Sequence, residues 1–379
     1  MTERSYPAFF MRGGTSKALM FRAEDLPDRA LWDGIFTGAM GSPDSYGRQL
    51  NGMGGGISSL SKVCIVGRSD RPDADVDYTF GQVLIDEGRV DYRGNCGNMS
   101  SAVGPFAVEV GLVKPSGQQA VVRIFNTNTG KIIRSIFPIR DGSVVYDGDF
   151  EIPGVSGAGA PIELQFLDPG GASTGRLQPT GRPSDLIVLD SGSITGSMVD
   201  AANACVFILA KDLGLSGIES PAELDGRPDI LRRLADIRRH ASVIMGIAQS
   251  LDEADAISAV PFIAIAGPPQ DFHSLDGGLV SALDHDFSLR VISNGQPHRA
   301  APLTIALCAA VAARIDGSVL AGFMDRRASG CPIRIGTPSG VLTVDAAVAK
   351  NASGHWAAST GTFFRTARRL FEGRVWSLT

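Results

Sequence analysis

Two apolar segments, made mostly of small residues, constrain the fold of this chain more than any other feature. The first, MSSAVGPFAVEVGLV, begins at Met99, and the second, APLTIALCAAVAARI, begins at Ala301. Neither segment has a polar face, so each is predicted to form a buried helix, the first ending near Gly111. One segment lies in each half of the chain, and each follows a strand and a Gly/Asn turn. This is a weak sign of internal duplication, because the sequence itself does not repeat.

Strand signals surround both segments and predict an α+β fold. The opening AFFMRGGTSKALMF is typical of two strands joined by a glycine turn, and residues 57–94 contain three further strand patterns. Residues 167–186 are the part of the chain richest in glycine, proline and small polar residues, which favours a domain boundary there. We therefore predict domains 1–183 and 184–379, with a C-terminal segment that is free to pack back on the first domain.

The charge of the chain excludes several classes of partner. The sequence has 35 basic and 40 acidic residues, interleaved, for a net charge of −5. No global positive field is available for nucleic acid or for an anionic membrane surface. The two most basic stretches, LRRLADIRRH and RTARRLFEGR, are interpreted as solvated helix faces without a function.

Targeting and metal-binding signals are likewise missing from the sequence. No stretch approaches the roughly 18 uninterrupted apolar residues of a membrane helix, and the N-terminus has no leader pattern. Five scattered cysteines and five histidines form no zinc or redox motif. We expect a cytoplasmic protein without a membrane segment and without a metal.

The starts of the two buried helices are candidate anion sites. The first backbone N–H groups of a helix have no intrahelical acceptor and lie at the positive end of its dipole, where they bind carboxylates. Two such starts facing each other would suit a di- or tricarboxylate. The candidate residues are Asn95, Gly97 and Asn98 at the first start, and Asn294, Gly295 and His298 at the second. The alternative is that these residues are only caps and turns.

Two residues carry candidate acid–base chemistry. Cys96 stands at the first helix start, where the helix dipole favours the reactive thiolate, although a structural thiol is the alternative. Lys62 opens a strand after the glycine loop NGMGGGISSLSK, which is neither a P-loop nor a dinucleotide fingerprint. A lysine in a partly desolvated pocket can act as a general base, whereas the alternative is an exposed lysine at a strand edge. We expect the glycines of this loop to approach a ligand closely.

The opening hairpin offers further donors for a carboxylate. Arg12 can clamp a carboxylate with two parallel N–H groups, and Ser16 can add a hydroxyl. A hairpin with a charged rim is the alternative.

With these residues in view, the chain resembles the PrpF family of methylaconitate and aconitate isomerases, which is related to oxalomesaconate tautomerase and methylitaconate isomerase. The matching motifs are MRGGTSK, GSPDSYGRQLNGMGGGISSLSKV, DVDYTFGQVLID, GNCGNMSSAVGPFAVEVGLV, VDAANACVFILAKDLG, RVISNGQPHRA, IRIGTPSG and RTARRLFEGRV. They follow one another from residue 11 to 375, so the resemblance covers nearly the whole chain.

The resemblance implies a fold and a chemistry. The implied fold is that of diaminopimelate epimerase: two similar domains, each a curled mixed sheet around a central helix, with the active site between them. The implied reaction is a proton shift or cis–trans isomerisation in an unsaturated polycarboxylate, without cofactor or metal. It places the catalytic lysine at Lys62 and the cysteine at Cys96. Carboxylate binding would fall to Arg12, Ser16, Asn95, Gly97, Asn98, Asn294, Gly295 and His298.

Several alternatives stay open. The proton could return from Lys62 itself or from Cys96, so one-base and two-base mechanisms are not separated. The second candidate helix start, ISNGQPHRA, has no cysteine, which disfavours a racemase with one thiol in each half. An oxalomesaconate-type tautomerase is the alternative within the same class, and a non-catalytic accessory of an aconitase-like enzyme is the alternative from another class. The sequence also leaves a homodimer open.

Overall fold

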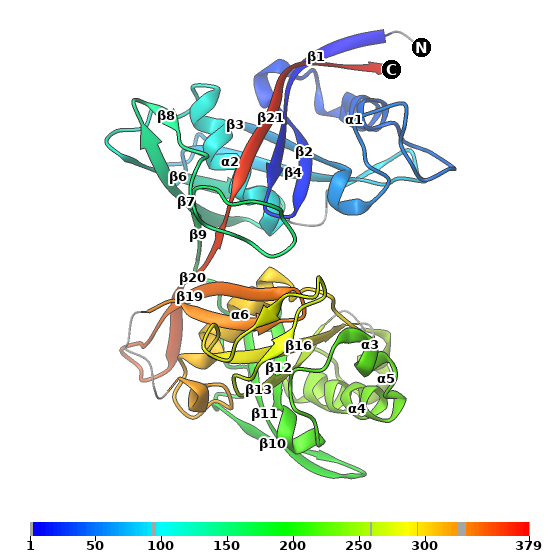
Figure 1. Cartoon of the computed structure of the whole chain (residues 1–379), viewed down its shortest axis with the longest axis vertical. Coiled ribbons are helices and arrows are strands. Elements are labelled where there is room, and N and C mark those ends of the chain that lie inside the picture. Colours follow the sequence, from blue (N-terminus) through cyan, green and yellow to red (C-terminus); the bar gives the residue numbers. More distant parts are fainter. Residues whose placement is uncertain (1–2, 93–95, 258–259, 294, 325–330, 379) are drawn as a thin grey trace. The chain divides into compact units, whose positions relative to one another are not determined.

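The computed structural model describes residues 3–92, 96–257, 260–293, 295–324 and 331–378 of the chain. It divides the chain into two compact units (Figure 1). The first contains Met1–Phe166 and Phe364–Thr379, and the second contains Leu167–Phe363. Each unit combines a sheet with helices, which confirms the mixed fold of helices and strands expected from the sequence.

The first unit contains two α-helices among its described residues, α1 and α2, and its strands include both ends of the described chain. Its strands are β1 (Glu3–Gly13), β2 (Ser16–Arg22), β3 (Lys62–Arg68), β4 (Val76–Val83), β5 (Val90–Asp91), β6 (Gln119–Asn126), β7 (Lys131–Arg140), β8 (Ser143–Val144), β9 (Ile162–Leu167) and β21 (Ala367–Leu378). Its helices are α1 (Trp32–Met40) and α2 (Gly97–Glu109), with short 3-10 turns η1 (Ala23–Asp25), η2 (Arg29–Leu31) and η3 (Ser58–Leu60).

The sheet of this unit surrounds α2. Its strands pair in the order β21-β1-β2-β3-β4-β6-β7-β9, with parallel pairs at β2–β3 and β4–β6 and antiparallel pairs elsewhere. Helix α2 packs against strands near both ends of this order, from β21 and β1 to β7. Its small residues allow that close packing, because a Cβ added at Gly104 would meet the Ser135 hydroxyl at 2.6 Å. The first buried helix predicted from the sequence is therefore confirmed.

The second unit repeats these kinds of element and adds helices on its surface. Its strands are β10 (Asp185–Leu189), β11 (Gly192–Ala201), β12 (Asn203–Leu209), β13 (Phe262–Gly267), β14 (Phe272–His273), β15 (Leu279–Val280), β16 (Phe287–Ser293), β17 (Gln296–Pro297), β18 (Ile333–Thr337), β19 (Gly340–Lys350) and β20 (Trp356–Arg365), whose last two residues belong to the first unit. Its helices are α3 (Pro221–Asp225), α4 (Pro228–Ile244), α5 (Leu251–Ala256) and α6 (Leu303–Ala313), with 3-10 turns η4 (Ala210–Leu213) and η5 (Ala321–Phe323).

The two units share one succession of strand pairings. In the second unit the order is β10-β11-β12-β13-β16-β18-β19-β20, and its parallel pairs, β12–β13 and β16–β18, stand third and fifth, as in the first unit. In both units a short strand lies between a long strand and the buried helix in the chain. The order is β4, β5, α2 in the first unit and β16, β17, α6 in the second. Every residue of α6 from Ile305 to Ala313 is buried. The weak sign of duplication in the sequence thus corresponds to a repeated topology.

The C-terminal basic stretch differs from its prediction. RTARRLFEGR was interpreted as a solvated helix face, but Ala367–Leu378 is strand β21, which pairs with β1 over its whole length (Figure 1). Arg365, just before it, is buried. The other basic stretch does lie on a helix, α4.

The division between the units also differs from the boundary that we placed at 183/184. It falls at 166/167, and the segment that follows belongs to the second unit. The reason is the buried carboxylate of Asp200 on β11, which accepts hydrogen bonds from the backbone N–H groups of Ser173 and Thr174. These charge-assisted bonds hold the glycine-rich segment against the second unit, although its composition is typical of a linker.

Candidate functional site

Lys62 lies on the face of the first sheet that α2 covers. It begins β3, directly beside Ala18 of β2 and opposite Gln82 of β4. Side chains alternate between the two faces of a strand, so Lys62 and Cys64 share a face, as do Gln82, Phe80 and Tyr78. The prediction that Lys62 opens a strand is confirmed, but its side chain is buried rather than exposed at an edge.

The amine of Lys62 is held by a neutral group. Nζ donates a hydrogen bond to Oε1 of Gln82 at 2.5 Å and lies 5.1 Å from the centre of the Phe80 ring. Among the described residues, no carboxylate forms an ion pair with it. A buried amine without an acidic partner suits proton abstraction better than a purely structural role.

Cys96 is the N-cap residue of α2. Its carbonyl accepts the N–H of Ser100 at 3.0 Å, while its side chain makes no capping bond. The thiol is partly exposed, and its sulfur lies 4.0 Å from the hydroxyl oxygen of the buried Ser16. The predicted helix start at Cys96 is therefore present, and Gly97 is the first helical residue.

Lys62 and Cys96 lie close to a common neighbour, the buried Cys64. Burial raises the pKa of the Cys64 thiol, a neighbouring Cys96 thiolate would raise it further, and the Lys62 charge lowers it. The Cys64 sulfur is also 3.7 Å from the hydroxyl of Tyr78, whose pKa burial raises as well. The candidate base and the candidate thiol thus belong to one cluster around Cys64, to which the sheet contributes Lys62 and the start of α2 contributes Cys96.

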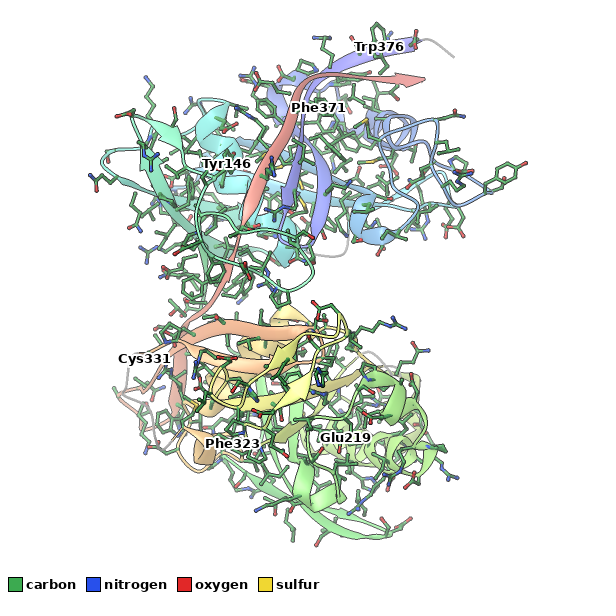
Figure 2. All side chains as sticks on the ribbon, in the orientation of Figure 1. Tyr146, Glu219, Phe323, Cys331, Phe371 and Trp376 are labelled. Carbon is green, nitrogen blue, oxygen red and sulfur yellow. The ribbon has the colours of Figure 1, made fainter. Side chains whose placement is uncertain are left out.

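Cysteine reactivity should follow this arrangement. We expect iodoacetamide at pH 8 to modify Cys96 and the exposed Cys331 of the native protein (Figure 2). Cys64, Cys205 and Cys308 are buried with raised pKa values, so they stay protonated at this pH and should react only after unfolding. Peptide mass spectrometry of native and guanidinium-treated protein measures this. Rapid native labelling of Cys64 would contradict the arrangement.

The opening hairpin packs onto the start of α2. Two of the residues predicted to bind a carboxylate, Arg12 and Asn98, make hydrogen bonds to protein groups here. Nη1 of Arg12 donates to the carbonyl oxygens of Gly14 and Thr366, each at 3.0 Å. The side-chain amide of Asn98 donates to Thr15 at 3.0 Å and accepts from Arg365 at 3.3 Å. The side chain of Asn98 is thus engaged within the protein. Its backbone N–H lies in the first turn of α2 and can donate to a ligand.

Arg365 and Gln82 are site residues that the sequence analysis missed. Burial lowers the pKa of Arg365 to about 10, which still leaves its guanidinium charged at neutral pH beside the start of α2. In the sequence, Arg365 begins the basic stretch RTARRLFEGR, which was interpreted as a solvated helix face, so a role in the site was not expected. Gln82 had a clearer signal, because it continues the alternation Tyr78, Phe80, Gln82 as a polar residue on an inward face.

The second-half candidates do not form a helix start. Gly295, with φ of 73°, lies in the tight turn between β16 and β17. His298 follows β17, 6.2 Å from the Phe262 ring, and burial lowers its pKa. The N-cap of α6 is Pro302, four residues further along. The sequence prediction therefore placed the second helix start too early, around the short strand β17 instead of at Pro302. Asn294, and Asn95 in the first half, lie outside the described residues.

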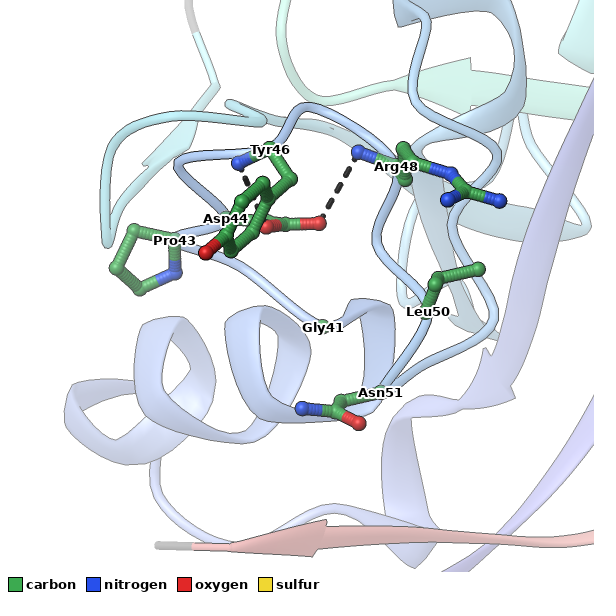
Figure 3. A pocket seen from close by; sticks show the side chains of 7 residues that line it. All are labelled: Gly41, Pro43, Asp44, Tyr46, Arg48, Leu50 and Asn51. Carbon is green, nitrogen blue, oxygen red and sulfur yellow. Dashed lines mark hydrogen bonds between the residues drawn. The ribbon is translucent and has the colours of Figure 1, made fainter.

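The glycine loop before Lys62 packs against its own unit rather than standing open to a ligand. A Cβ added at Gly52 would lie 2.2 Å from the backbone of Met40 and Gly41. Nearby, seven residues between Gly41 and Asn51 line a pocket of about 400 Å³. Among them, the Asp44 carboxylate accepts the backbone N–H groups of Tyr46 and Arg48 (Figure 3). None of the predicted site residues lines this pocket.

Substituting Gly52 tests this packing. Gly52→Ala should lower the free energy of unfolding by about 1–3 kcal/mol, because the new methyl group overlaps backbone atoms that cannot move independently. Gly34→Ala is the matched control: a Cβ there meets nothing within 4 Å, and alanine in helix α1 should stabilise by about 0.5–1 kcal/mol. Urea unfolding measures both. Equal stability of the two variants would contradict the close approach.

The described residues offer no group of three or more metal-ligating side chains, and none of the described helices is long and apolar enough to cross a membrane.

Comparison with known proteins places the chain in a family. The sequence profile of the PrpF protein family matches residues 4–377. The chain belongs to the PrpF family. It is thus an isomerase, as the sequence predicted.

Named relatives of this PrpF protein cover nearly its full length. It is 39% identical to the 2-methyl-aconitate isomerase of Cupriavidus necator, over 97% of this chain and 96% of that protein. It is 37% identical to the 4-oxalomesaconate tautomerase of Pseudomonas putida, over 99% and 97%. The crystal structure of a methylitaconate-delta-isomerase matches with a TM-score of 0.92 at 38% identity, covering 100% of this chain and 96% of that one. This PrpF protein therefore shares its fold with an isomerase of known structure.

Proposed function

We propose that this PrpF isomerase moves a proton across the allylic system of an unsaturated di- or tricarboxylate such as aconitate or 2-methylaconitate. The observation that carries the proposal is the buried amine of Lys62, which belongs to the same cluster around Cys64 as Cys96 does. The names of the relatives, two isomerases and a tautomerase of unsaturated acids, support the substrate class.

The proposed chemistry needs a base and a site for developing negative charge. Lys62, as the base, takes a proton from the carbon next to the double bond, and the electron pair moves into the conjugated carboxylate as a dienolate. The first-turn N–H groups of α2, at Gly97 and Asn98, and the Arg365 guanidinium would stabilise that charge. A proton then returns to the far allylic carbon, from the Lys62 ammonium or from the Cys96 thiol, and the double bond is shifted.

The finer fold assignment belongs to the same proposal. We assign the chain to the diaminopimelate epimerase-like fold, because each unit surrounds a buried helix with the same succession of strands. The remaining proposed carboxylate-binding residues are Arg12, Ser16 and Asn95 in the first unit and Asn294, Gly295 and His298 in the second.

Proton NMR in D₂O tests the function directly. Purified protein is incubated with cis-aconitate, trans-aconitate, 2-methylaconitate, methylitaconate and oxalomesaconate, each in a separate tube. Deuterium entering an allylic position of aconitate or 2-methylaconitate, with formation of its isomer, is the expected result. Reaction of oxalomesaconate alone would replace the proposal by a keto–enol tautomerase. No exchange with any of the five acids would overturn the proposal.

A further inference from the structure

We infer that Gln82 is the positioning residue for the Lys62 amine, and that its neutral amide keeps that amine from pairing with an anion. The inference rests on the proposed function, in which Lys62 is the base. It adds a residue to which neither the sequence motifs nor the relatives' names assign a role. Four rotatable bonds separate the Lys62 amine from its backbone, so the position of the nitrogen depends on what holds it.

The Gln82 amide has one possible orientation. Its Nε2 donates to the carbonyl oxygens of Ser61 at 2.9 Å, Ser58 at 3.1 Å and Val83 at 3.3 Å. Its Oε1 accepts from Lys62. Turning the amide over would face its oxygen toward three carbonyl oxygens, which are also acceptors. The SSLS turn that precedes Lys62 in the chain therefore orients the amide that holds Lys62.

The neutrality of this acceptor matters because the described residues place few other charged groups around Lys62. Cys64 lies on its own strand, Cys96 approaches from α2, and Asp91 of β5 stands opposite Gln82 on the far side of β4. From β2, its direct neighbour is the uncharged Ala18. A carboxylate at position 82 would reach the amine directly and would hold it as an ammonium ion, which cannot accept the substrate's proton.

Gln82→Glu tests the inference by adding a charge at similar volume. It also replaces the NH₂ group that donates to Ser58, Ser61 and Val83 by an oxygen, so urea unfolding first verifies that the variant folds. Two quantities are followed against pH: kcat/KM for the acid that reacts, and acetylation of Lys62 by acetic anhydride, measured by mass spectrometry of its peptide. We expect both pH profiles to shift to higher pH by about 1–3 units, because an anion within hydrogen-bonding distance favours the charged amine. At pH 7, kcat/KM should fall by roughly 10- to 1000-fold and recover as the pH is raised.

Gln119→Glu is the matched control, since Gln119 is an exposed residue of strand β6 in the same unit. It carries the same added charge and should keep both wild-type curves. Superimposable curves for Gln82→Glu and Gln119→Glu would overturn the inference.

A second variant separates position from charge. Gln82→Met removes the acceptor at similar volume, and we expect kcat to fall roughly 10- to 100-fold, with KM changed by less than about threefold, because the base is displaced while substrate binding persists. A wild-type kcat in Gln82→Met would overturn the positioning role. The acetylation curves need no turnover, so they decide the inference about Gln82 even if none of the acids reacts and the proposed function fails.

Discussion

Replacing Lys62 by alanine is expected to lower the rate of allylic deuterium exchange by about 10²–10⁴-fold, the range that a positioned general base contributes. The Gln82 amide, which accepts a hydrogen bond from the Lys62 amine, is too weak a base to replace it. Integration of the allylic proton signal in D₂O against time measures the rate. KM should change much less than kcat, because the proposed contacts to the carboxylates are made by other groups.

The control for this experiment is Lys131→Ala. Lys131 also begins a strand, β7, but it is exposed, so its loss should leave the exchange rate unchanged. Urea unfolding of both variants verifies that they fold. Lys62→Ala that exchanges deuterium within threefold of wild type, while folded, would remove Lys62 from the chemistry and shift attention to Cys96.

Local patterns were sufficient to predict the elements that carry the candidate site. The small apolar residues after Cys96 predict a buried helix, and the helix begins at Gly97. Glycine and polar residues before Lys62 predict a strand start, and β3 begins there. Both are short-range signals, because a helix start and a strand start depend on a few consecutive residues.

Features that depend on distant pairing were not predicted. Strand β21 is a strand because it pairs with β1, more than 350 positions earlier, and an arginine-rich sequence gives no local indication of this. Without that pairing the burial of Arg365 could not be foreseen. Gln82 is a similar case: its role depends on the turn at Ser58–Leu60 and on Lys62, which come together only in the sheet.

The repeated topology also shows which residues of the second unit stand at the positions of the proposed base and thiol. Phe262 begins β13 and pairs alongside β12, as Lys62 begins β3 and pairs alongside β2. Pro302 caps α6, as Cys96 caps α2. The positions that hold an amine and a thiol in the first unit thus hold an apolar ring and a proline in the second. The proposed amine and thiol of the first unit therefore have no counterpart at the equivalent positions of the second.

Arg365→Met is expected to weaken binding of the polycarboxylate by about 10- to 100-fold. Its guanidinium is buried and donates to the side chain of Asn98 at the start of α2, and a buried charged donor stabilises a carboxylate by about 1.5–3 kcal/mol. Calorimetric titration with tricarballylate measures the affinity. This saturated acid carries three carboxylates but no allylic proton, so its binding is separate from catalysis.

Arg374→Met controls for the loss of an arginine from the same C-terminal segment, because Arg374 is exposed on β21 and bonds to Ser5. It should bind tricarballylate as wild type does. Arg365→Lys keeps the charge but has one nitrogen in place of the fork, so an intermediate affinity is expected if the guanidinium contacts the ligand. Wild-type affinity in a folded Arg365→Met protein would contradict that contact. The first turn of α2 would then be left as the main source of positive potential for the substrate.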